Sequence, residues 1–369
     1  MIKIFHTADI HLDTPFSLSD PIESEKRRQE FRDTFCNVIS KAKEYGAEIF
    51  LISGDFFEDI FITKNTADLV VREISNFPSC RFFICAGNHD PYSENSPYAL
   101  LNWPENAYIF KSPSLSYVDI PEKNLRIYGY SYTDKNHPEN IFENFTLEDI
   151  SKINILMAHG FINMPSDTCN IMMEKDAEKF GFDYIALGHV HSHTGFMKYG
   201  NTIAAYPGCM LGRDFNEDGF KGVICGSIEK GRADLEFCKV SDKHFEKVSV
   251  DISGTKTVKD AISKITNSVS HLDGNTYLRI TAEGITSPDV LLSDEIVLEN
   301  LKRFPKAEFI DNTLPLFEFE KLKQDKTIVG SFFRKIEPML YDEDTNKRKT
   351  AMLALRYGLA ALLGKEVNL

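Results

Sequence analysis

Phe82-Phe83-Ile84-Cys85-Ala86 runs directly into Gly87-Asn88-His89-Asp90, so an apolar stretch typical of a buried strand ends in a polar cluster. The same order recurs at four more places: Asp9-Ile10-His11, Gly54-Asp55, His159-Gly160 and Gly188-His189-Val190-His191. Loops that follow the carboxyl ends of strands are where α/β sheets place their ligand sites. We therefore expect five polar loops to converge at one sheet edge, although they lie far apart in the sequence.

The residues around these motifs alternate between strand-like and helix-like patterns. We expect strands at residues 2–5, 49–53, 82–86, 155–158 and 184–187, with amphipathic helices at 23–45 and 65–76 between them. This alternation predicts an α/β fold with a mostly parallel, buried sheet. From residue 194 the segments become shorter and β-rich, including 223–228 and 234–240, and they suggest a second sheet packed on the first.

A change of pattern near residue 244 predicts further structural units, because 369 residues are too many for one ordinary core. Strands at 248–252, 277–282 and 307–311, with helices at 258–269 and 293–304, indicate a small α/β unit. The chain from 328 onward is expected to be helical. The predicted domains are residues 1–243, 244–318 and 319–369.

Composition restricts the class of protein. The net charge of −13 argues against a protein that coats nucleic acid through its overall field, but it does not exclude a nuclease. Residues 1–6 read as the start of a strand and not as a signal peptide, and no apolar run reaches the ~18 residues that span a bilayer. Seven cysteines without a CxxC pair favour buried free thiols. We expect a cytoplasmic protein with no membrane association.

The side chains in the five motifs suit a site for two divalent metals. Carboxylate, imidazole and carboxamide groups are ligands for manganese, iron or zinc. In the pairs Asp9/His11 and His189/His191, alternate residues of an extended chain point to the same side. The glycines before Asp55, Asn88 and His189 allow the backbone to turn sharply after each strand.

Taken together and in this order, the motifs resemble the signature of calcineurin-like metallophosphoesterases, over about residues 1–240. The resemblance implies a four-layer α-β-β-α sandwich. It also implies that Asp9, His11 and His191 hold one metal, that Asn88, His159 and His189 hold the other, and that Asp55 bridges the two. His89 would be catalytic and face the substrate phosphate, and Asp90 would orient His89. A hydroxide activated by the metals would attack phosphorus, and manganese is the expected ion, with iron or zinc as alternatives.

Two further segments narrow the resemblance to DNA-repair nucleases of the SbcD/YhaO type. They are residues 6–16, and Tyr206-Pro207-Gly208 followed by Gly212-Arg213 and Glu217-x-Gly219-x-Lys221-Gly222. The resemblance implies an exonuclease or endonuclease acting on DNA, a small cap that positions DNA, and a helical C-terminal segment that docks onto an SMC-like ATPase of the SbcC/YhaN type. Relatives often form homodimers. Some relatives carry a histidine three residues after the bridging aspartate, where this chain has Glu58.

Other functions and side-chain roles stay open. A phosphoesterase for nucleotides or small metabolites would use the same metal chemistry, and a non-catalytic binding module would keep the fold. Glu58-Asp59 fits a solvated loop or a cleft wall equally well. Arg213 and Lys221 are candidates for phosphate contacts. We expect His6 to be structural, His193 to lie at the rim of the site, and the other three histidines to be on the surface: His137, His244 and His271.

Overall fold

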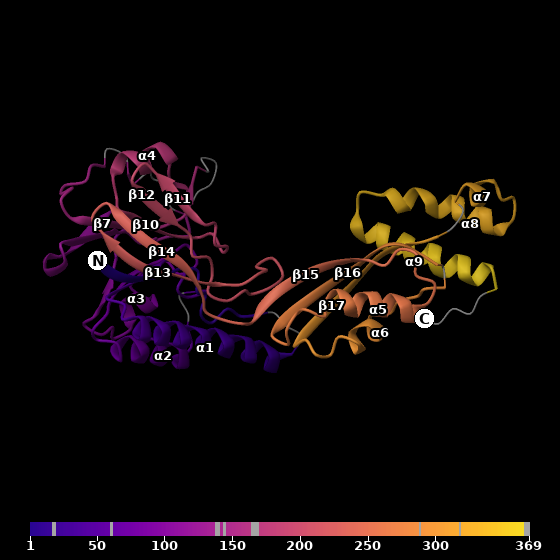
Figure 1. Cartoon of the computed structure of the whole chain (residues 1–369), viewed down its shortest axis with the longest axis horizontal. Coiled ribbons are helices and arrows are strands. Elements are labelled where there is room, and N and C mark those ends of the chain that lie inside the picture. The colour runs from indigo at the N-terminus through magenta and orange to yellow at the C-terminus, as the bar shows by residue number, and fades with distance from the viewer. Residues whose placement is uncertain are drawn as a thin grey trace. The chain divides into compact units, whose positions relative to one another are not determined.

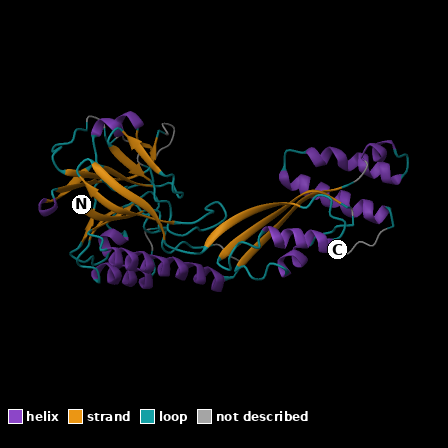
Figure 2. Cartoon of the chain, in the orientation of Figure 1, coloured by secondary structure: helices purple, strands orange, loops and turns teal. Residues whose placement is uncertain are grey.

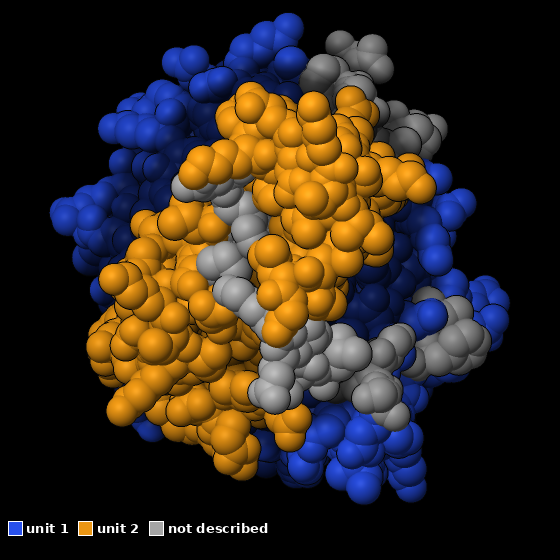
Figure 3. Space-filling view, turned by 90° about the vertical axis from the view of Figure 1, so that its right-hand side faces the viewer, with its two compact units in different colours: residues 1–244 blue, residues 245–369 orange. Residues whose placement is uncertain are grey.

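The structure is a computed structural model that describes residues 1–16, 20–59, 62–136, 141, 142, 145–163, 170–287, 289–316 and 319–364. Its elements fall into two units, residues 1–244 and residues 245–369, which Figure 3 colours blue and orange. The division into three domains at residues 243 and 318 stays a prediction. His137 lies outside the described residues, so its surface position also stays a prediction.

The first sheet of residues 1–244 has the strand order β14-β13-β1-β2-β3-β4 within the described part of the chain. Figure 1 labels β13 and β14 of this sheet, and Figure 2 draws the strands in orange. Strands β1 to β4 run parallel, whereas β13 and β14 pair antiparallel at one side. The bounds are β1 (Ile2–Thr7), β2 (Ile49–Ser53), β3 (Arg81–Cys85), β4 (Ala107–Ile109), β13 (Gly222–Glu229) and β14 (Arg232–Lys239).

The second sheet has the order β11-β12-β10-β7-β6-β5 among the described residues. Its central strands β6, β7, β10 and β12 are parallel, and β5 and β11 are antiparallel edges. The bounds are β5 (Ser116–Ile120), β6 (Leu125–Gly129), β7 (Ile153–His159), β10 (Tyr184–Gly188), β11 (Phe196–Tyr199) and β12 (Thr202–Ala205). A small pair, β8 (Phe161–Ile162) and β9 (Asn170–Met172), follows β7.

Helices cover the outer faces of the two sheets. They are α1 (Pro21–Tyr45), α2 (Lys64–Ser75), α3 (Pro97–Leu100) and α4 (Glu174–Phe180). Helix α1 begins where the Asp20 side chain accepts a hydrogen bond from the Ile22 backbone and Pro21 fixes the first turn. It ends at Gly46, whose φ of 75° is a left-handed conformation that glycine adopts without strain.

Alternate residues of each strand face different layers, and this arrangement builds three apolar cores. Phe82 packs with α1 and α2, whereas its neighbour Phe83 packs between the two sheets. Ile155 faces the same inter-sheet core from β7, and Leu156 faces the layer that contains α4. The period of two in a strand explains this alternation. The four-layer α-β-β-α sandwich is therefore confirmed, in a mixed α/β fold.

The set of strands that we expected in the second sheet was partly wrong. We expected the β-rich segments after residue 194 to form that sheet. Instead β13 and β14 complete the first sheet, while β7 and β10 belong to the second. The reason is that β13 pairs antiparallel with β1, more than 200 residues earlier in the chain. A local hydrophobic pattern indicates a strand but not its distant partner.

Residues 245–369 contain a smaller sheet and a group of helices. The sheet order is β15-β16-β17, with β15 (His244–Asp251), β16 (Thr276–Thr286) and β17 (Lys306–Pro315). Helices α5 (Val258–Ser268) and α6 (Asp294–Glu299) share its apolar core. The helices α7 (Phe319–Gln324), α8 (Ile328–Ile336) and α9 (Thr345–Leu362) follow, and Arg356 of α9 forms an ion pair with Asp311 of β17. Helices at the C-terminus were expected and are confirmed.

Two cysteines differ from the expected free thiols. Cys225 of β13 and Cys238 of β14 form a disulfide, because the antiparallel pairing of the two strands brings them together. Cys36, Cys80, Cys85 and Cys209 are free, and burial raises the pKa of the last three thiols. Within the described residues, each helix is too short or too polar to cross a membrane.

Candidate metal centre

The carboxyl ends of β1, β2 and β3 bring the first three motifs together. These strands are parallel neighbours, so the loops carrying Asp9, Asp55 and Asn88 leave the sheet at the same edge. Backbone hydrogen bonds join two of the loops: the Ile10 and His11 N–H groups both donate to the Asp55 carbonyl, at 2.8 and 3.0 Å. The second sheet adds the loops after β7 and β10, which carry the remaining histidines.

The backbone at four predicted ligands is strained. Asp9, His11 and Asp55 each have a φ of 50°, and His189 has a φ of 100°. Residues other than glycine seldom adopt positive φ, and such positions cluster at functional sites. Glycine is needed where the loops approach most closely: a Cβ on Gly188 would overlap the Ser53 carbonyl oxygen.

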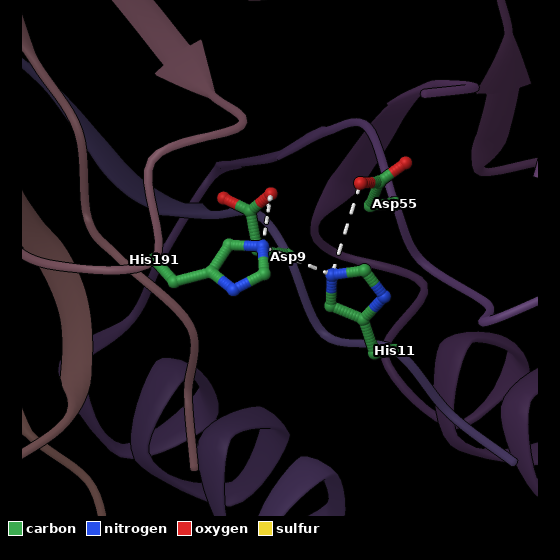
Figure 4. Close-up of side chains that lie close together, drawn as sticks. All are labelled: Asp9, His11, Asp55 and His191. Carbon is green, nitrogen blue, oxygen red and sulfur yellow. Dashed lines mark hydrogen bonds and ion pairs between the residues drawn. The ribbon is translucent and has the colours of Figure 1, made fainter. Parts of the chain in front are cut away.

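Four side chains form the first cluster of potential metal ligands, as Figure 4 shows: Asp9, His11, Asp55 and His191. The Nε2 atoms of His11 and His191 are 3.3 Å apart. Nε2 of His11 lies 3.7 Å from Asp55, and Nε2 of His191 lies 3.7 Å from Asp9. The two carboxylates and His11 are buried, while His191 is half-buried. The backbone N–H of His189 donates to the Asp9 carboxylate and fixes its position.

The second cluster shares Asp55 with the first and adds His159 and His189. Nε2 of His159 is 3.3 Å from the Asp55 carboxylate and 3.0 Å from Oδ1 of Asn88. Nδ1 of His189 is 3.1 Å from the same Asn88 oxygen. The structure thus brings all seven predicted ligands into two adjoining groups with Asp55 between them. Their binding of metal remains a prediction.

The donor atoms of His159 test whether a cation fits this site. Its Nδ1 is 2.9 Å from the Ser53 carbonyl oxygen, which can only accept, so Nδ1 carries a proton. In a neutral imidazole Nε2 is then an acceptor, yet it faces the oxygens of Asp55 and Asn88. Acceptors that face one another in a buried space need a positive charge between them. The site therefore fits a divalent metal.

The pKa shifts of His159 and Asp55 also indicate that the site favours a positive charge. Burial alone would lower the pKa of His159, but the neighbouring Asp55 carboxylate raises it to about 9. Burial alone would raise the pKa of Asp55, but His159 and the other imidazoles hold it well below its usual range. In the chain without metal, a proton supplies the cation that a metal ion replaces.

His89 lies beside both clusters at the wall of a pocket. The pocket has a volume of about 460 Å³ and is lined by Asp13, Pro15, Glu58, Asp59, Asn88, His89 and Lys135. The His89 side chain is 39% exposed, and its Nδ1 is 3.2 Å from the Glu58 carboxylate. That contact raises the pKa of His89. His89 is therefore the imidazole of this site that is best placed to meet a substrate in the pocket.

Asp90 does not contact the His89 ring through its described hydrogen bonds. Its carboxylate accepts from the backbone N–H groups of Phe57 and Gly87, both at 2.8 Å, and from the Tyr98 hydroxyl. Burial raises its pKa to about 7. The expectation that Asp90 orients His89 is wrong in this geometry, because Glu58 occupies that position. Asp90 instead fixes the loops that carry Asp55 and Asn88, and its catalytic role stays a prediction.

Two carboxylates at the outer edge of the site were not assigned from the sequence. Glu58 was weighed as a loop or cleft residue, and it lies 2.9 Å from Nδ1 of His11. Glu217 accepts from Nδ1 of His191 at 2.6 Å. Burial alone would raise the pKa of both carboxylates, but the histidines and, for Glu217, Arg213 hold each below its usual range. For Glu217, the sequence signal was its place four residues after Arg213, a spacing that allows the two side chains to form an ion pair.

Several weaker predictions can be compared with the structure. His6 is buried and bonds the Tyr184 hydroxyl at 2.7 Å, and burial lowers its pKa to about 3, as suits a structural residue. His193 is half-buried near the site, and His271 is exposed. His244 is buried, so its predicted surface position is wrong: its ring packs 4.2 Å from that of Phe220. Lys221 is buried as well and donates to the His191 carbonyl, so a contact with substrate phosphate is excluded in this conformation.

Comparison with known proteins gives the family of the chain. Residues 2–193, more than half of the chain, match the profile of the calcineurin-like phosphoesterases, so the chain belongs to this family. An uncharacterized metallophosphoesterase, YhaO of Bacillus subtilis, is 26% identical over 309 residues, which cover 79% of this chain and 74% of that protein.

Two archaeal proteins are similar at the same level. The DNA double-strand break repair protein Mre11 of Methanocaldococcus jannaschii is 27% identical over 281 residues, 70% of this chain and 72% of that protein. A protein of the same name from Thermoplasma acidophilum is 27% identical over 237 residues, 58% of this chain and 60% of that protein. The resemblance to YhaO and Mre11 proteins therefore extends beyond the family profile.

Proposed function

We propose that this calcineurin-like phosphoesterase is a two-metal phosphodiesterase that hydrolyses DNA as a repair exonuclease or endonuclease. The observation that carries the proposal is the pair of ligand clusters that share Asp55 and lie beside the pocket of His89. A shared carboxylate can bridge the two neighbouring cations of a two-metal site. The similarity to proteins named for DNA double-strand break repair supports DNA as the substrate.

The metal assignment follows the two clusters. Asp9, His11 and His191 would hold one ion, with Asp55 as the bridge to the other ion. The second ion would be held by Asn88, His159 and His189. Such ions, when bound, neutralise phosphate charge and lower the pKa of a water molecule. Manganese is our proposed ion, and iron or zinc would suit the same ligands.

The residues of the chain itself supply position and hydrogen bonds. His89 faces the pocket, and Glu58 and the Asp55 carboxylate hold it through its ring and its backbone N–H, at 3.2 and 3.0 Å. From this position the imidazole can donate a hydrogen bond to a phosphate oxygen and assist the leaving oxygen. Asp9 and Asp55 are buried, and the predicted ligand Asn88 lines the pocket beside His89.

The pocket lining favours a second candidate, a phosphoesterase for nucleotides or small metabolites. Three carboxylates, Asp13, Glu58 and Asp59, line the pocket, with Lys135 as a cation among the lining residues. Together with the net charge of −13, this lining repels a long chain of phosphates more than a single phosphoester.

One comparison separates the two candidates. The full chain loaded with manganese is given labelled single-stranded DNA, labelled double-stranded DNA and bis-p-nitrophenyl phosphate. A nuclease cleaves the oligonucleotides with a higher kcat/KM than the small ester. The opposite preference, kept over a range of salt concentrations, favours the small-substrate phosphoesterase and contradicts DNA as the substrate.

Partners and location belong to the same proposal. We propose that the helices α8 and α9 dock onto an SMC-like ATPase of the SbcC/YhaN type, with a homodimer and a cytoplasmic location as further expectations. Exposed apolar side chains on these helices and their connection support docking: Ile328, Met339, Tyr341 and Leu353. Co-purification of such an ATPase with the full chain, lost after Tyr341→Glu and Leu353→Glu, tests this part.

A further inference from the structure

Arg213 joins two carboxylates that contact different histidines of the first ligand cluster. Its Nη1 is 3.2 Å from Glu58, while its Nε and Nη2 are 2.9 and 2.7 Å from Glu217. The backbone N–H of Arg213 also donates to Glu217, at 2.7 Å. The Arg213 side chain is 21% exposed and Glu217 is buried. A planar fork with five N–H groups can hold two carboxylates at once. We call Glu58, Arg213 and Glu217 the Arg213 bridge.

Each carboxylate of the Arg213 bridge contacts the outer nitrogen of one predicted histidine ligand. Glu217 is 2.6 Å from Nδ1 of His191, and Glu58 is 2.9 Å from Nδ1 of His11. The contact with His11 is not an aligned hydrogen bond, so its attraction is mainly electrostatic. A carboxylate this close to Nδ1 favours the proton on that atom. It thereby leaves Nε2 of both rings free to bind a metal.

The Nδ1 atom of His191 has a second close neighbour besides Glu217. Nη2 of Arg213 is 2.9 Å from Nδ1 of His191, and a protonated Nδ1 cannot accept a hydrogen bond from it. The Glu217 oxygen is closer to Nδ1, at 2.6 Å, and it can only accept. We therefore assign the hydrogen bond to Glu217 and regard the Arg213 contact as a close approach that their shared carboxylate imposes.

The second cluster depends on a different support. The outer nitrogen of His159 donates to the carbonyl of Ser53, a backbone group of β2. This support is neutral and built into the sheet, so no side-chain substitution removes it. The Arg213 bridge thus acts on the ligands of the first cluster, His11 and His191. Through Glu58 it also reaches the Nδ1 atom of His89.

We propose that Arg213 is a positioning residue for the first metal: it holds Glu58 and Glu217 so that they orient His11 and His191. This inference rests on the proposed two-metal function. Without Arg213 the two carboxylates lose their common cation, and the rings they orient gain freedom to turn. Outer-shell partners of this kind typically change metal affinity by about 10–100-fold. Loss of Arg213 should therefore weaken the first metal by about this factor and leave the second in place.

The alternative role for Arg213 is the phosphate contact expected from the sequence. Three of its side-chain nitrogens already face carboxylates, which favours the positioning role. The two roles give different kinetics. A phosphate contact raises KM at every manganese concentration, whereas a positioning role shows a loss of kcat that excess manganese restores.

The test measures manganese binding by the full chain directly. Isothermal titration gives the number of ions and their Kd values, and electron paramagnetic resonance distinguishes a coupled pair of ions from an isolated one. Wild type is compared with Arg213→Ala, with Arg213→Lys and with Arg126→Ala. Arg126 is a matched control, because it also contacts two carboxylates, Asp119 at 2.7 Å and Glu148 at 3.0 Å, at a site away from the ligands.

We expect two ions and a coupled spectrum for wild type and Arg126→Ala. Arg213→Ala should keep one ion, bind the second about 10–100-fold more weakly, and show the spectrum of isolated Mn²⁺. Arg213→Lys should lie between, because one ammonium cannot hold both carboxylates in the same geometry. If Arg213→Ala does not fold, the number of bound manganese ions and their Kd values in Arg213→Lys and Glu58→Gln test the inference instead. Two ions bound with wild-type affinity by the variants contradict this inference alone. A wild type that binds none of manganese, iron and zinc contradicts the proposed function itself.

Discussion

The Nε2 atoms of His11 and His191 lie 3.3 Å apart although 180 positions separate the two residues in the chain. His11 follows β1 of the first sheet, and His191 follows β10 of the second. The first cluster therefore forms only when the two sheets pack with their carboxyl ends at the same side. Binding of metal there reports directly on the assembly of the sandwich.

Replacing His89 should slow catalysis strongly while both metal ions stay bound. His89→Leu removes the imidazole at the pocket wall but none of the predicted ligands, so manganese content should stay at two ions. We expect kcat to fall by about 10²–10⁴-fold, the usual contribution of a proton-transfer group. The measurement is kcat on oligonucleotide or bis-p-nitrophenyl phosphate beside metal content. His271→Leu, at an exposed position, is the control. Normal turnover by His89→Leu would remove His89 from the mechanism.

The carboxylate shared by the clusters should matter for both metals. Asp55→Asn keeps the shape of the side chain but removes its negative charge, so both ions should bind at least about 100-fold more weakly, beyond a typical outer-shell effect. Metal analysis of the purified variant checks this result. Asp260→Asn, an exposed residue of α5, should bind metal as wild type does. Retention of either ion at normal affinity by Asp55→Asn would contradict the bridging position.

Close backbone approach at Gly188 gives a prediction about stability. An alanine Cβ there would overlap the Ser53 carbonyl oxygen and press on the His159 ring. Gly188→Ala should cost about 1–3 kcal/mol of unfolding free energy, as overpacking in a core does. It should also weaken the metal held by His159. Gly274→Ala is the matched control, because its Cβ would meet its nearest neighbour at an ordinary 3.5 Å. Equal melting temperatures for the two variants would show that the site has more room than the structure indicates.

The sequence predicts the site better than it predicts the sheets that carry it. Apolar runs followed by polar clusters identify Asp9, Asp55 and Asn88, because the carboxyl ends of neighbouring parallel strands must meet at one edge. The antiparallel pairing of β13 with β1 has no local signal in the sequence, so we wrongly expected β13 and β14 in the second sheet.

The sequence also does not predict which distant side chains contact one another in the site. Glu58 lies outside the quoted motifs, and the motif that contains Glu217 does not reveal its partner, because the contacts of both carboxylates with His11 and His191 arise only when the loops converge. Asp90 lies directly after His89, but its carboxylate turns toward the backbone of Phe57 and Gly87 instead. Neighbours in sequence were thus a poor guide to which carboxylate supports which imidazole.

The core between the sheets should be sensitive to lost volume. Leu51 of β2 is completely buried there, so Leu51→Ala should lower the free energy of unfolding by about 2–5 kcal/mol. Urea unfolding followed by tryptophan fluorescence and circular dichroism measures the change. Leu353→Ala, at a position 49% exposed on α9, should change stability little. A Leu51→Ala protein as stable as wild type would contradict the packing of the inter-sheet core.

Removing metal should destabilise the folded chain. Ions that bind only the folded state stabilise it by about 2.7 kcal/mol at a free concentration of 100 times Kd. Dialysis against a chelator should therefore lower the melting temperature, and manganese should restore it. Calorimetry of wild type and Asp55→Asn checks this expectation, since the variant should not respond to manganese. An identical shift in both proteins would mean that the stabilising ions bind elsewhere.

The most direct test of the proposed two-metal nuclease is the cleavage rate of labelled single- and double-stranded DNA as manganese is added to the metal-free full chain. We predict no cleavage without metal, a rate that rises to a plateau at two ions per chain, and cleavage by metal-loaded His89→Leu that is about 10²–10⁴-fold slower. Cleavage that is independent of added metal, or a plateau at one ion, would contradict the two-metal site. Absence of cleavage at full metal loading would contradict DNA as the substrate of the chain alone.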